Sequence, residues 1–224
     1  MINLRRFLGS FITSFITRKH GFIVFFNDPG RVGTIDLIRR VKEESFLLLS
    51  MSEAFQLHQL VSETGKIGGA VAEVGVFMGA SAKIICEAKG DRVLYLFDTF
   101  DGLPDMRDRE RKQFKYSDFT SSYDFVVKYL EGYDNVETIK GFFPGSGGAV
   151  SGEKFSIVHL DVDIYESTMD SLIFFYDKMS KGGIILIHDY YRLTGVKEAV
   201  DEFMDDKREP VIGLTGTQCM IVKL

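Results

Sequence analysis

The chain has 224 residues, 45% of them hydrophobic and 26% charged, and a formal net charge of −5; these values favour one globular α/β domain with a short extension. The mildly acidic balance gives no reason to expect a nucleic-acid partner. Two cysteines, Cys86 and Cys219, lie in apolar runs and cannot form a disulfide framework or a cysteine-based metal site. We expect buried free thiols and a reducing compartment, the cytoplasm.

The first 26 residues are rich in apolar side chains at helical spacing. Arg18, Lys19 and His20 interrupt this run well short of a membrane span, and no convincing signal-peptide cleavage site follows it. We expect an amphipathic helix packed on the domain or on a second subunit of a homodimer. Docking to a membrane surface or a hydrophobic substrate is the alternative.

A second helical region is expected over residues 35–61, with a break near Ser50–Ser52. Glycines over residues 65–69 then mark the start of a different pattern. We therefore expect an N-terminal helical extension over residues 1–64, packed on a core domain formed by residues 65–224.

Five short apolar runs alternate with helical segments in the core domain. Runs of this kind predict a parallel sheet that is covered by helices on both faces. The chain ends in a helix over 196–206 and two strand-like runs over 210–214 and 218–222, which predict a hairpin with one antiparallel strand. The expected fold is therefore α/β and Rossmann-like, with strands over residues 67–74, 93–97, 136–139, 156–160 and 183–187.

The first strand leads into a glycine turn with the spacing E-x-G-x-x-x-G. Glycine allows a close approach between backbone and ligand, and the helix that follows offers free N–H groups. The spacing lacks the G-x-G-x-x-G of dinucleotide-binding turns, and a purely structural turn is the alternative. The candidate cofactor-binding residues of this turn are Glu73, Gly75, Phe77, Gly79 and Ser81.

Acidic residues follow four of the five expected strands, at the edge where such sheets bind ligands. This convergence indicates a polar ligand, a cation or both, whereas helix and turn capping is the alternative. Asp98, 25 residues after Glu73, is placed to accept hydrogen bonds from ribose hydroxyls. Thr99, Phe100 and Gly141 are further candidates for cofactor contacts because they also follow strand ends.

The fourth and fifth strands end in groups suited to metal or proton chemistry. On an extended chain Asp161 and Asp163 would point the same way, about 6–7 Å apart. Together with Asp189 they could hold a hard cation such as Mg²⁺, while a carboxylate outside the metal shell removes a proton. His188 could ligate metal, act as a base or be structural, and His159 is expected to be structural.

The terminal hairpin resembles that of the class I S-adenosylmethionine-dependent methyltransferases. Two further stretches are similar to motifs of the TylF/MycF/NovP-type (macrocin and novobiocic acid) O-methyltransferase family: D-V-D-I-Y-E-S-T from Asp161, and K-G-G-I-I-L-I-H-D-Y from Lys181. The glycine turn and the segment D-T-F-D-G-L-P from Asp98 are similar too. The resemblance covers about residues 65–205.

This resemblance implies Mg²⁺-dependent methyl transfer from S-adenosylmethionine to a hydroxyl of a sugar, a phenol or another small natural product. By position it implies metal ligation by Asp161 and Asp189, with Asp161 also near the cofactor, and Asp163 as general base. The family usually has two consecutive acids where this chain has His188 and Asp189. Because histidine suits Mg²⁺ poorly, three alternatives stay open. Fewer carboxylates hold the metal, another metal is used, or His188 takes over proton abstraction.

Residues 105–123 are highly charged before two aromatic side chains, which fits a solvated helix or a lid over the site. Phe142 and Phe143 fit an aromatic wall near an adenine or a place in the core. Two other function classes stay open: a nicotinamide-dependent reductase, disfavoured by the missing G-x-G-x-x-G, and a non-catalytic protein that kept the fold.

Overall fold

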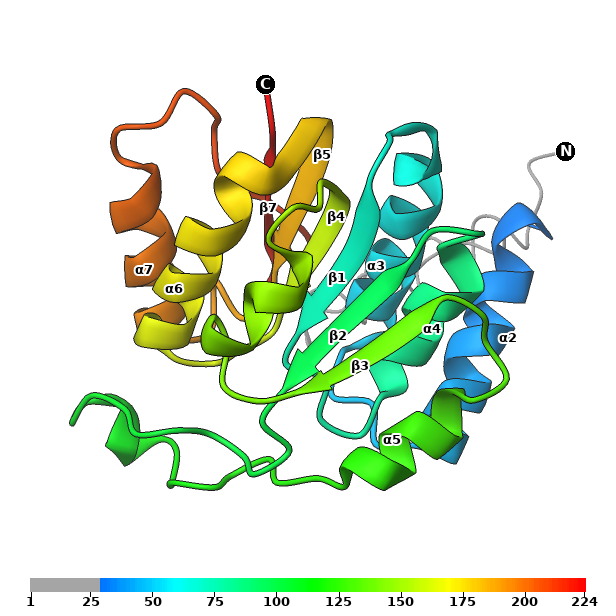
Figure 1. The fold of residues 1–224 in the computed structure, drawn as a ribbon, viewed down its shortest axis with the longest axis horizontal. Helices are drawn as coiled ribbons and strands as arrows, with labels where there is room; N and C mark the ends of the chain where they lie inside the picture. Colours follow the sequence, from blue (N-terminus) through cyan, green and yellow to red (C-terminus); the bar gives the residue numbers. More distant parts are fainter. Residues whose placement is uncertain (1–28) are drawn as a thin grey trace, which may run out of the picture.

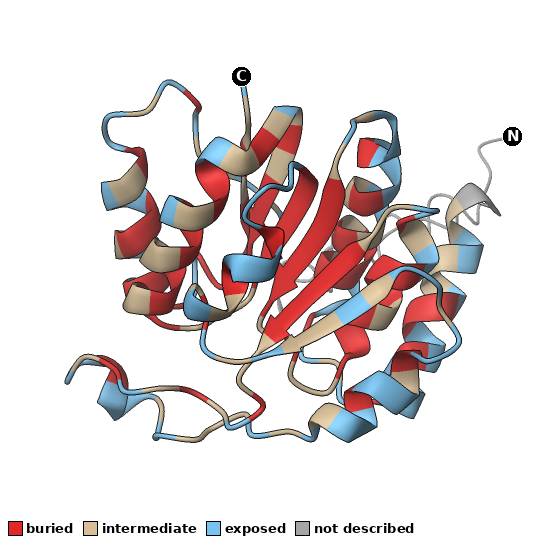
Figure 2. Ribbon diagram, in the orientation of Figure 1, coloured by how far each residue is buried: buried red, intermediate tan, exposed pale blue. Residues whose placement is uncertain are grey.

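The computed structural model describes residues 29–224, so the predicted N-terminal amphipathic helix lies outside the described residues. The described chain forms three layers, with a central sheet between two groups of helices (Figure 1). Almost all residues of the central strands are buried (Figure 2). This explains why these strands are continuously apolar in sequence.

The sheet has seven strands in the order β3-β2-β1-β4-β5-β7-β6. β1 to β5 pair in parallel, and β7 runs antiparallel to both β5 and β6. The predicted parallel sheet with a C-terminal hairpin is therefore confirmed. The strands are β1 (Ala70–Val74), β2 (Leu94–Asp98), β3 (Val136–Lys140), β4 (Phe155–Leu160), β5 (Met179–Ile187), β6 (Ile212–Gly213) and β7 (Cys219–Val222).

Helices cover both faces of the sheet because the strand side chains alternate between two hydrophobic cores. One core joins strand residues such as Val71 and Ile157 to α2 (Pro29–Glu44), α3 (Met51–Glu63), α4 (Ala80–Ala88) and α5 (Tyr123–Leu130). The other joins residues such as Val74 and Leu160 to α6 (Tyr165–Phe175) and α7 (Thr194–Met204). The predicted break near Ser50 is real, since Ser50 and Glu53 form a capping box at the start of α3.

The first core also crosses the predicted boundary at residue 64, because Ile38, Val41 and Leu57 belong to the same cluster as Val71. The helices before residue 64 thus share a hydrophobic core with the sheet. The division into a helical extension and a core domain stays a prediction. Both cysteines are buried and free, as predicted, and burial raises the pKa of each thiol to about 12. Within residues 29–224 no helix is long and apolar enough to cross a membrane.

The centre of the sheet is the point where strand order reverses, because β1 lies between β2 and β4. Ligands of open α/β sheets bind beyond the carboxyl ends of strands at such a point. Here the ends of β1 and β4 lie close together: the Asp161 N–H, just after β4, donates to the Val74 carbonyl of β1 at 2.9 Å. A Cβ atom on Gly75, whose φ is +90°, would lie 1.9 Å from the Asp161 carbonyl oxygen. The glycine is required by this contact between strands.

We predict that Gly75→Ala destabilises the fold strongly, because the added methyl overlaps rigid backbone and the left-handed φ disfavours a side chain. The expected loss in free energy of unfolding is at least about 1–3 kcal/mol, measured by urea denaturation. Gly68→Ala is the matched control, because a Cβ there meets nothing within 4 Å. Equal stability of the two variants would contradict the account.

Candidate active site

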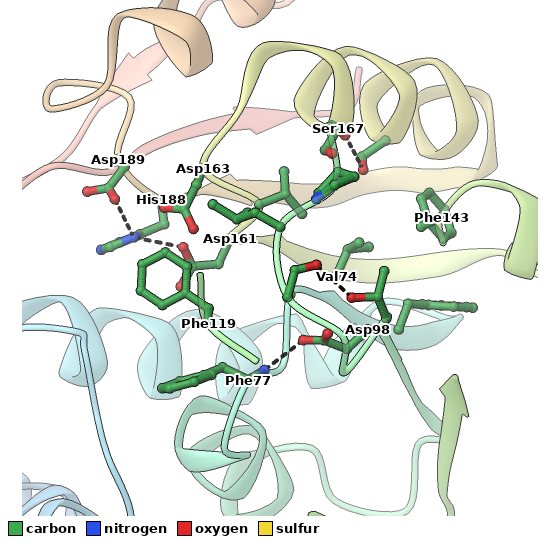
Figure 3. A pocket seen from close by; sticks show the side chains of 18 of the residues that line it. Val74, Phe77, Asp98, Phe119, Phe143, Asp161, Asp163, Ser167, His188 and Asp189 are labelled. Carbon is green, nitrogen blue, oxygen red and sulfur yellow. Dashed lines mark hydrogen bonds and ion pairs between the residues drawn. The ribbon is translucent and has the colours of Figure 1, made fainter. Parts of the chain in front are cut away.

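A pocket lies at the carboxyl edge of the sheet, between the loops that follow β1 to β5 (Figure 3). Acidic groups of Asp161, Asp163 and Asp189 gather on one side of it, and Asp98 and Phe143 lie on the other. The pocket therefore has a charged end and a largely aromatic and apolar end. Its lining includes these predicted residues: Gly75, Phe77, Asp98, Thr99, Gly141, Asp161, Asp163, His188 and Asp189.

Four residues predicted to bind the cofactor lie elsewhere. Glu73 is fully buried inside β1, and Gly79 and Ser81 sit buried at the start of α4. Gly79 has a left-handed backbone, and a Cβ there would face Val126 and Tyr129 of α5. Phe100 is buried against Tyr123 in the core. None of these four belongs to the lining of the pocket, so their roles in binding stay predictions.

Asp98 ties the loop after β1 to the loop after β2. Its Oδ2 accepts hydrogen bonds from the N–H groups of Val76 and Phe77 at 2.7 and 2.8 Å. Its Oδ1 accepts one from Phe100 at 2.7 Å. An ionised carboxylate has about four lone-pair sites, so three are occupied by backbone and one remains for a ligand. The side chain therefore shapes the glycine turn as well as facing the pocket.

Glu73 and His159 form a buried pair on neighbouring strands. Nδ1 of His159 lies 2.9 Å from Oε1 of Glu73, and both side chains are at most 1% exposed. Burial raises the pKa of Glu73, against the lowering effect of His159. This pairing fits the structural role predicted for His159. Glu73 Oε2 and His159 Nε2 have no hydrogen-bond partner within the described part of the chain.

Four pocket-edge loops contain a non-glycine residue with a left-handed backbone: Phe77 (φ +49°), Phe100 (+59°), Asp163 (+61°) and Asp189 (+59°). A left-handed backbone is uncommon for residues other than glycine, and it is rarest for bulky side chains such as phenylalanine. Residues strained in this way cluster at functional sites. The left-handed backbone of Asp163 also corrects the prediction that Asp161 and Asp163 point the same way on an extended chain. β4 ends at Leu160 and a tight turn, closed by the Ile164 N–H donating to the Val162 carbonyl, is centred on Asp163, so Asp161 and Asp163 do not lie on an extended strand.

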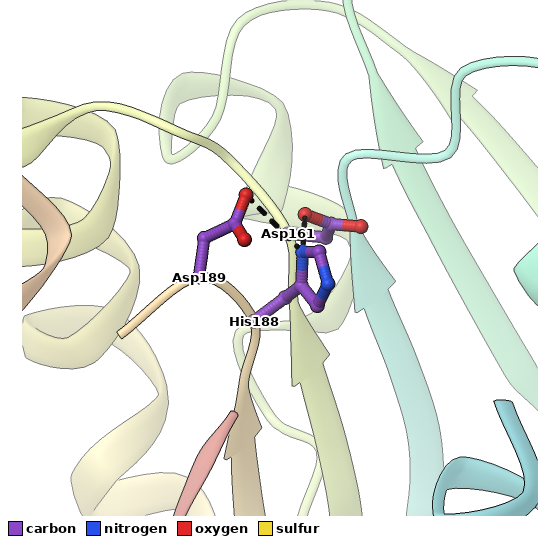
Figure 4. Close-up of side chains that lie close together, drawn as sticks. All are labelled: Asp161, His188 and Asp189. Atoms are coloured by element: carbon purple, nitrogen blue, oxygen red, sulfur yellow. Dashed lines mark hydrogen bonds and ion pairs between the residues drawn. The ribbon is translucent and has the colours of Figure 1, made fainter. Parts of the chain in front are cut away.

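His188 lies among three carboxylates. Its Nδ1 is 3.0 Å from Asp161 Oδ1 and 3.4 Å from Asp189 Oδ2 (Figure 4). Its Nε2 is 3.7 Å from Oε2 of Glu53 in α3. All four residues are largely buried, with His188 only 6% exposed. Oδ1 of Asp189 is buried and has no hydrogen-bond partner among residues 29–224, so it is available to a ligand.

The pKa values at this cluster follow from burial and mutual charge. Burial, and then the charges of Asp161 and Asp189, raise the pKa of Asp163 to about 8. Burial acts to lower the pKa of His188, but the charge and hydrogen bond of Asp161, with Glu53, raise it to about 11. Without a bound metal His188 is therefore protonated at neutral pH, which disfavours its predicted role as base. Asp163 titrates near neutral pH, as a general base should.

A divalent metal was predicted between Asp161, His188 and Asp189, whose donor atoms lie within 4.8 Å of one another. However, His188 Nδ1 lies within 3.4 Å of an oxygen of each carboxylate, and a carboxylate can only accept its proton. Mg²⁺ requires oxygen ligands in a nearly ideal octahedron, and an N–H offers it no ligand. As arranged, this donor set does not fit Mg²⁺. The metal stays a prediction, and no step below depends on it.

The charged segment predicted over residues 105–123 is a loop with one short 3₁₀ turn at Glu110–Lys112, up to the start of α5 at Tyr123, so the predicted solvated helix is wrong. Glu110 anchors it, because its Oε1 accepts the Tyr165 N–H at the start of α6 at 2.7 Å and lies against Gly195 of α7. Arg109 also forms an ion pair with Glu198 of α7. The segment brings Phe114 and Phe119 into the pocket lining. Closure as a lid stays a prediction.

Sequence reasoning missed several residues of the site. Glu53 is one, although the capping-box spacing Ser50-x-x-Glu53 placed it at a helix start. Phe119 is another, and it packs edge-on against Phe77 with ring centroids 5.8 Å apart. No spacing in the sequence connects these residues to the acidic motif, because they lie on distant segments. Further lining residues not predicted include Leu103, Pro104, Ser167, Arg192 and Leu193. Phe142 and Phe143 do line the pocket, and Phe143 also packs on Phe175 in the core.

Comparison with known proteins agrees with this arrangement. The family model described as macrocin O-methyltransferase (TylF) matches residues 51–216. The chain belongs to the TylF family. The predicted resemblance is thereby confirmed, and the match includes α3 with Glu53 as well as the whole sheet up to the final hairpin.

Two similar curated proteins are O-methyltransferases of Streptomyces and Micromonospora. A demethyldecarbamoylnovobiocin O-methyltransferase of Streptomyces niveus is 28% identical over 61% of this chain and 58% of its own length. A mycinamicin III 3''-O-methyltransferase of Micromonospora griseorubida is 29% identical over 62% of this chain and 61% of its own length. The alignments thus span less than two thirds of these relatives.

Solved structures share the fold. The O-methyltransferase NovP aligns with a TM-score of 0.68 at 24% identity, covering 79% of this chain and 81% of NovP. The calicheamicin methyltransferase CalS11 aligns with a TM-score of 0.66 at 17% identity, covering 88% and 94%. The class I methyltransferase fold expected from the sequence is therefore confirmed.

We predict that Asp98→Ala lowers the free energy of unfolding by about 1–3 kcal/mol, because three backbone N–H groups lose a charged acceptor. Urea denaturation monitored by circular dichroism measures this. Asp101→Ala, an exposed acid three residues along the same loop, should change stability by less than about 0.5 kcal/mol. If Asp98→Ala were as stable as the control, Asp98 would not hold the glycine turn.

We also predict that the metal-free protein loses stability as pH rises from about 7 to 9.5. The folded state keeps protons on Asp163 and His188 up to about pH 8 and 11, whereas the unfolded chain releases them near about 3.9 and 6.5. Because the folded state binds more protons, these two groups make stability fall as pH rises, Asp163 between about pH 4 and 8 and His188 between about pH 6.5 and 11. Melting temperatures in EDTA should show this decline, with a shallower slope in His188→Asn. A flat or rising profile would refute it.

Proposed function

We propose that this chain is an S-adenosylmethionine-dependent O-methyltransferase that acts on a hydroxyl of a sugar or another small natural-product acceptor. Membership of the TylF family over residues 51–216 is the observation that carries the proposal. The relatives' names support the acceptor class: one acts at the 3'' oxygen of a mycinamicin, and another at the 4' oxygen of a rhamnosyl tetracenomycin. Structures of similar fold with S-adenosylhomocysteine support the cofactor.

We assign the cofactor to the side of the pocket formed by the loops after β1, β2 and β3. The free lone pair of Asp98 suits a ribose hydroxyl, and Thr99 and Gly141 border the same space. Phe142 and Phe143 supply apolar surface for an adenine. Phe77 and Phe119, which pack edge to face, also line the pocket. Asp161 belongs to the acidic group at the other side of the same pocket.

The acceptor side is assigned to the acidic end. A second hollow borders Asp163 and is lined by polar groups of Arg109, Gln113 and Thr194, which suit an acceptor that carries several hydroxyls. Asp189 Oδ1, buried and free of partners within the described chain, would accept a hydrogen bond from one of them. In this arrangement the acceptor and the cofactor meet at Asp163, which belongs to both hollows.

Bound S-adenosylmethionine supplies an electrophilic methyl group on a sulfonium. Asp163 removes the proton of the acceptor hydroxyl as the oxygen attacks: the carbon–sulfur bond breaks, the carbon–oxygen bond forms and the proton moves to the Asp163 carboxylate. A pKa of about 8 makes this carboxyl a strong base for an aspartate while leaving part of it ionised at neutral pH.

Two alternatives were left open by the sequence. A nicotinamide-dependent reductase is disfavoured by the TylF-family match and by the lack of a G-x-G-x-x-G turn. A non-catalytic protein with the same fold is disfavoured by the left-handed acids and the pocket that they face, since such strain is seldom kept without a use.

We predict that Asp163→Asn binds S-adenosylhomocysteine like the wild type but loses about 10²–10⁴-fold in turnover, because the amide cannot take the proton. Calorimetry measures the affinity. Methylation of a panel of deoxysugar glycosides and nucleotide sugars, detected by mass spectrometry, measures turnover.

Asp101→Asn, a surface acid in the loop after β2, is the matched control and should leave turnover unchanged. Full activity of Asp163→Asn would remove Asp163 as the base. Failure of the wild type to bind S-adenosylhomocysteine would contradict the proposed function itself.

A further inference from the structure

The ring of His188 occupies the place between the two carboxylates that were predicted to share a metal. One nitrogen, Nδ1, is 3.0 Å from Asp161 Oδ1 and 3.4 Å from Asp189 Oδ2 (Figure 4). Nδ1 forms a hydrogen bond with Asp161 Oδ1, and Asp189 Oδ2 lies next to the same nitrogen at ion-pair distance. A group that holds two carboxylates together in this way does what a bridging cation would do.

The surroundings of the ring fit this role and not that of a metal ligand. Behind the ring, Nε2 faces Oε2 of Glu53 at 3.7 Å, so both ring nitrogens are directed toward carboxylate oxygens. Glu53 is itself fixed, because its Oε1 accepts hydrogen bonds from the Thr217 N–H and hydroxyl at 2.7 and 2.8 Å. A histidine that ligates metal must present a bare nitrogen to it.

The donor groups of the cluster, two carboxylates and an imidazole, also argue against a Mg²⁺ site. Mg²⁺ prefers carboxylate, carbonyl and water oxygens, and imidazole suits softer transition metals. Asp161 and Asp189 alone give Mg²⁺ two carboxylates, one of which keeps an unpartnered oxygen within the described chain. The position next to Asp189, which would supply a third carboxylate if it were acidic, carries the imidazole instead.

We propose that His188 replaces a divalent cation in this chain, and that its imidazole positions Asp161 by a hydrogen bond and Asp189 by an ion pair for a reaction that needs no bound metal. His188 acts through these two carboxylates and is a positioning residue. The inference rests on the proposed methyl transfer for its catalytic meaning, but the binding experiment below does not.

The test compares Mg²⁺ binding by the wild type and His188→Asp, which restores two consecutive acids at the end of β5. Both full-length proteins are stripped with EDTA, then titrated with MgCl₂ by calorimetry and by thermal shift. We expect no site-specific binding to the wild type at about 10 mM Mg²⁺, and at least a tenfold tighter affinity, with a rise in melting temperature, in the variant. His188→Asn, which keeps an N–H donor and adds no charge, is the control and should gain nothing.

Saturable binding of Mg²⁺, Mn²⁺ or Zn²⁺ by the wild type that is lost in Asp189→Ala would overturn the proposal. So would a folded His188→Asp variant that binds no better than the wild type, because the histidine would then not be what displaces the metal. If His188→Asp does not fold, the wild-type titrations with the three metals decide alone.

Turnover by the wild type should be equal in EDTA and in Mg²⁺, and a loss of more than tenfold in EDTA would also contradict the proposal. Binding of S-adenosylhomocysteine is measured on the same samples. Its absence would count against methyl transfer, whereas the metal titrations would still decide the role of His188.

Discussion

The close contact between β1 and β4 is the constraint on which the site depends. Only a glycine at position 75 allows the chain after β1 to pass the Asp161 carbonyl oxygen. That passage brings the glycine turn beside the acidic segment at the point where strand order reverses. The pocket, its two ends and the approach of Asp98 to the turn all follow from it. The glycine at position 75 is therefore explained by the packing of the two strand ends, whether or not the turn also binds a ligand.

Burying several carboxylates at one edge is costly unless each has partners. The molecule meets this requirement in three ways: backbone N–H groups hold Asp98, a capping box and the hairpin hold Glu53, and His188 lies among Asp161, Asp189 and Glu53. At Asp163 burial and the charges of Asp161 and Asp189 outweigh those of His188 and Arg192, and the pKa rises to about 8. The residue proposed as the base is thus one whose charge the fold stabilises poorly.

Much of the architecture could be predicted from the sequence, because buried parallel strands and the final hairpin leave strong patterns in hydrophobicity. The acids at the strand ends were also predictable, since all parallel strands end at one edge. Local geometry was not: the left-handed backbone at Asp163 and the contact that requires Gly75 depend on neighbouring strands. Glu53 and Phe119 reach the site from distant segments, which no motif spacing reveals.

The central claim is that this pocket binds the cofactor of a methyl transfer. Isothermal titration of the wild-type protein with S-adenosylhomocysteine, in EDTA and at neutral pH, tests it most directly. The account predicts one site per chain with a dissociation constant in the micromolar range, about −8 kcal/mol at 1 μM. Absence of binding at millimolar ligand, by a protein that is folded by circular dichroism, would contradict it.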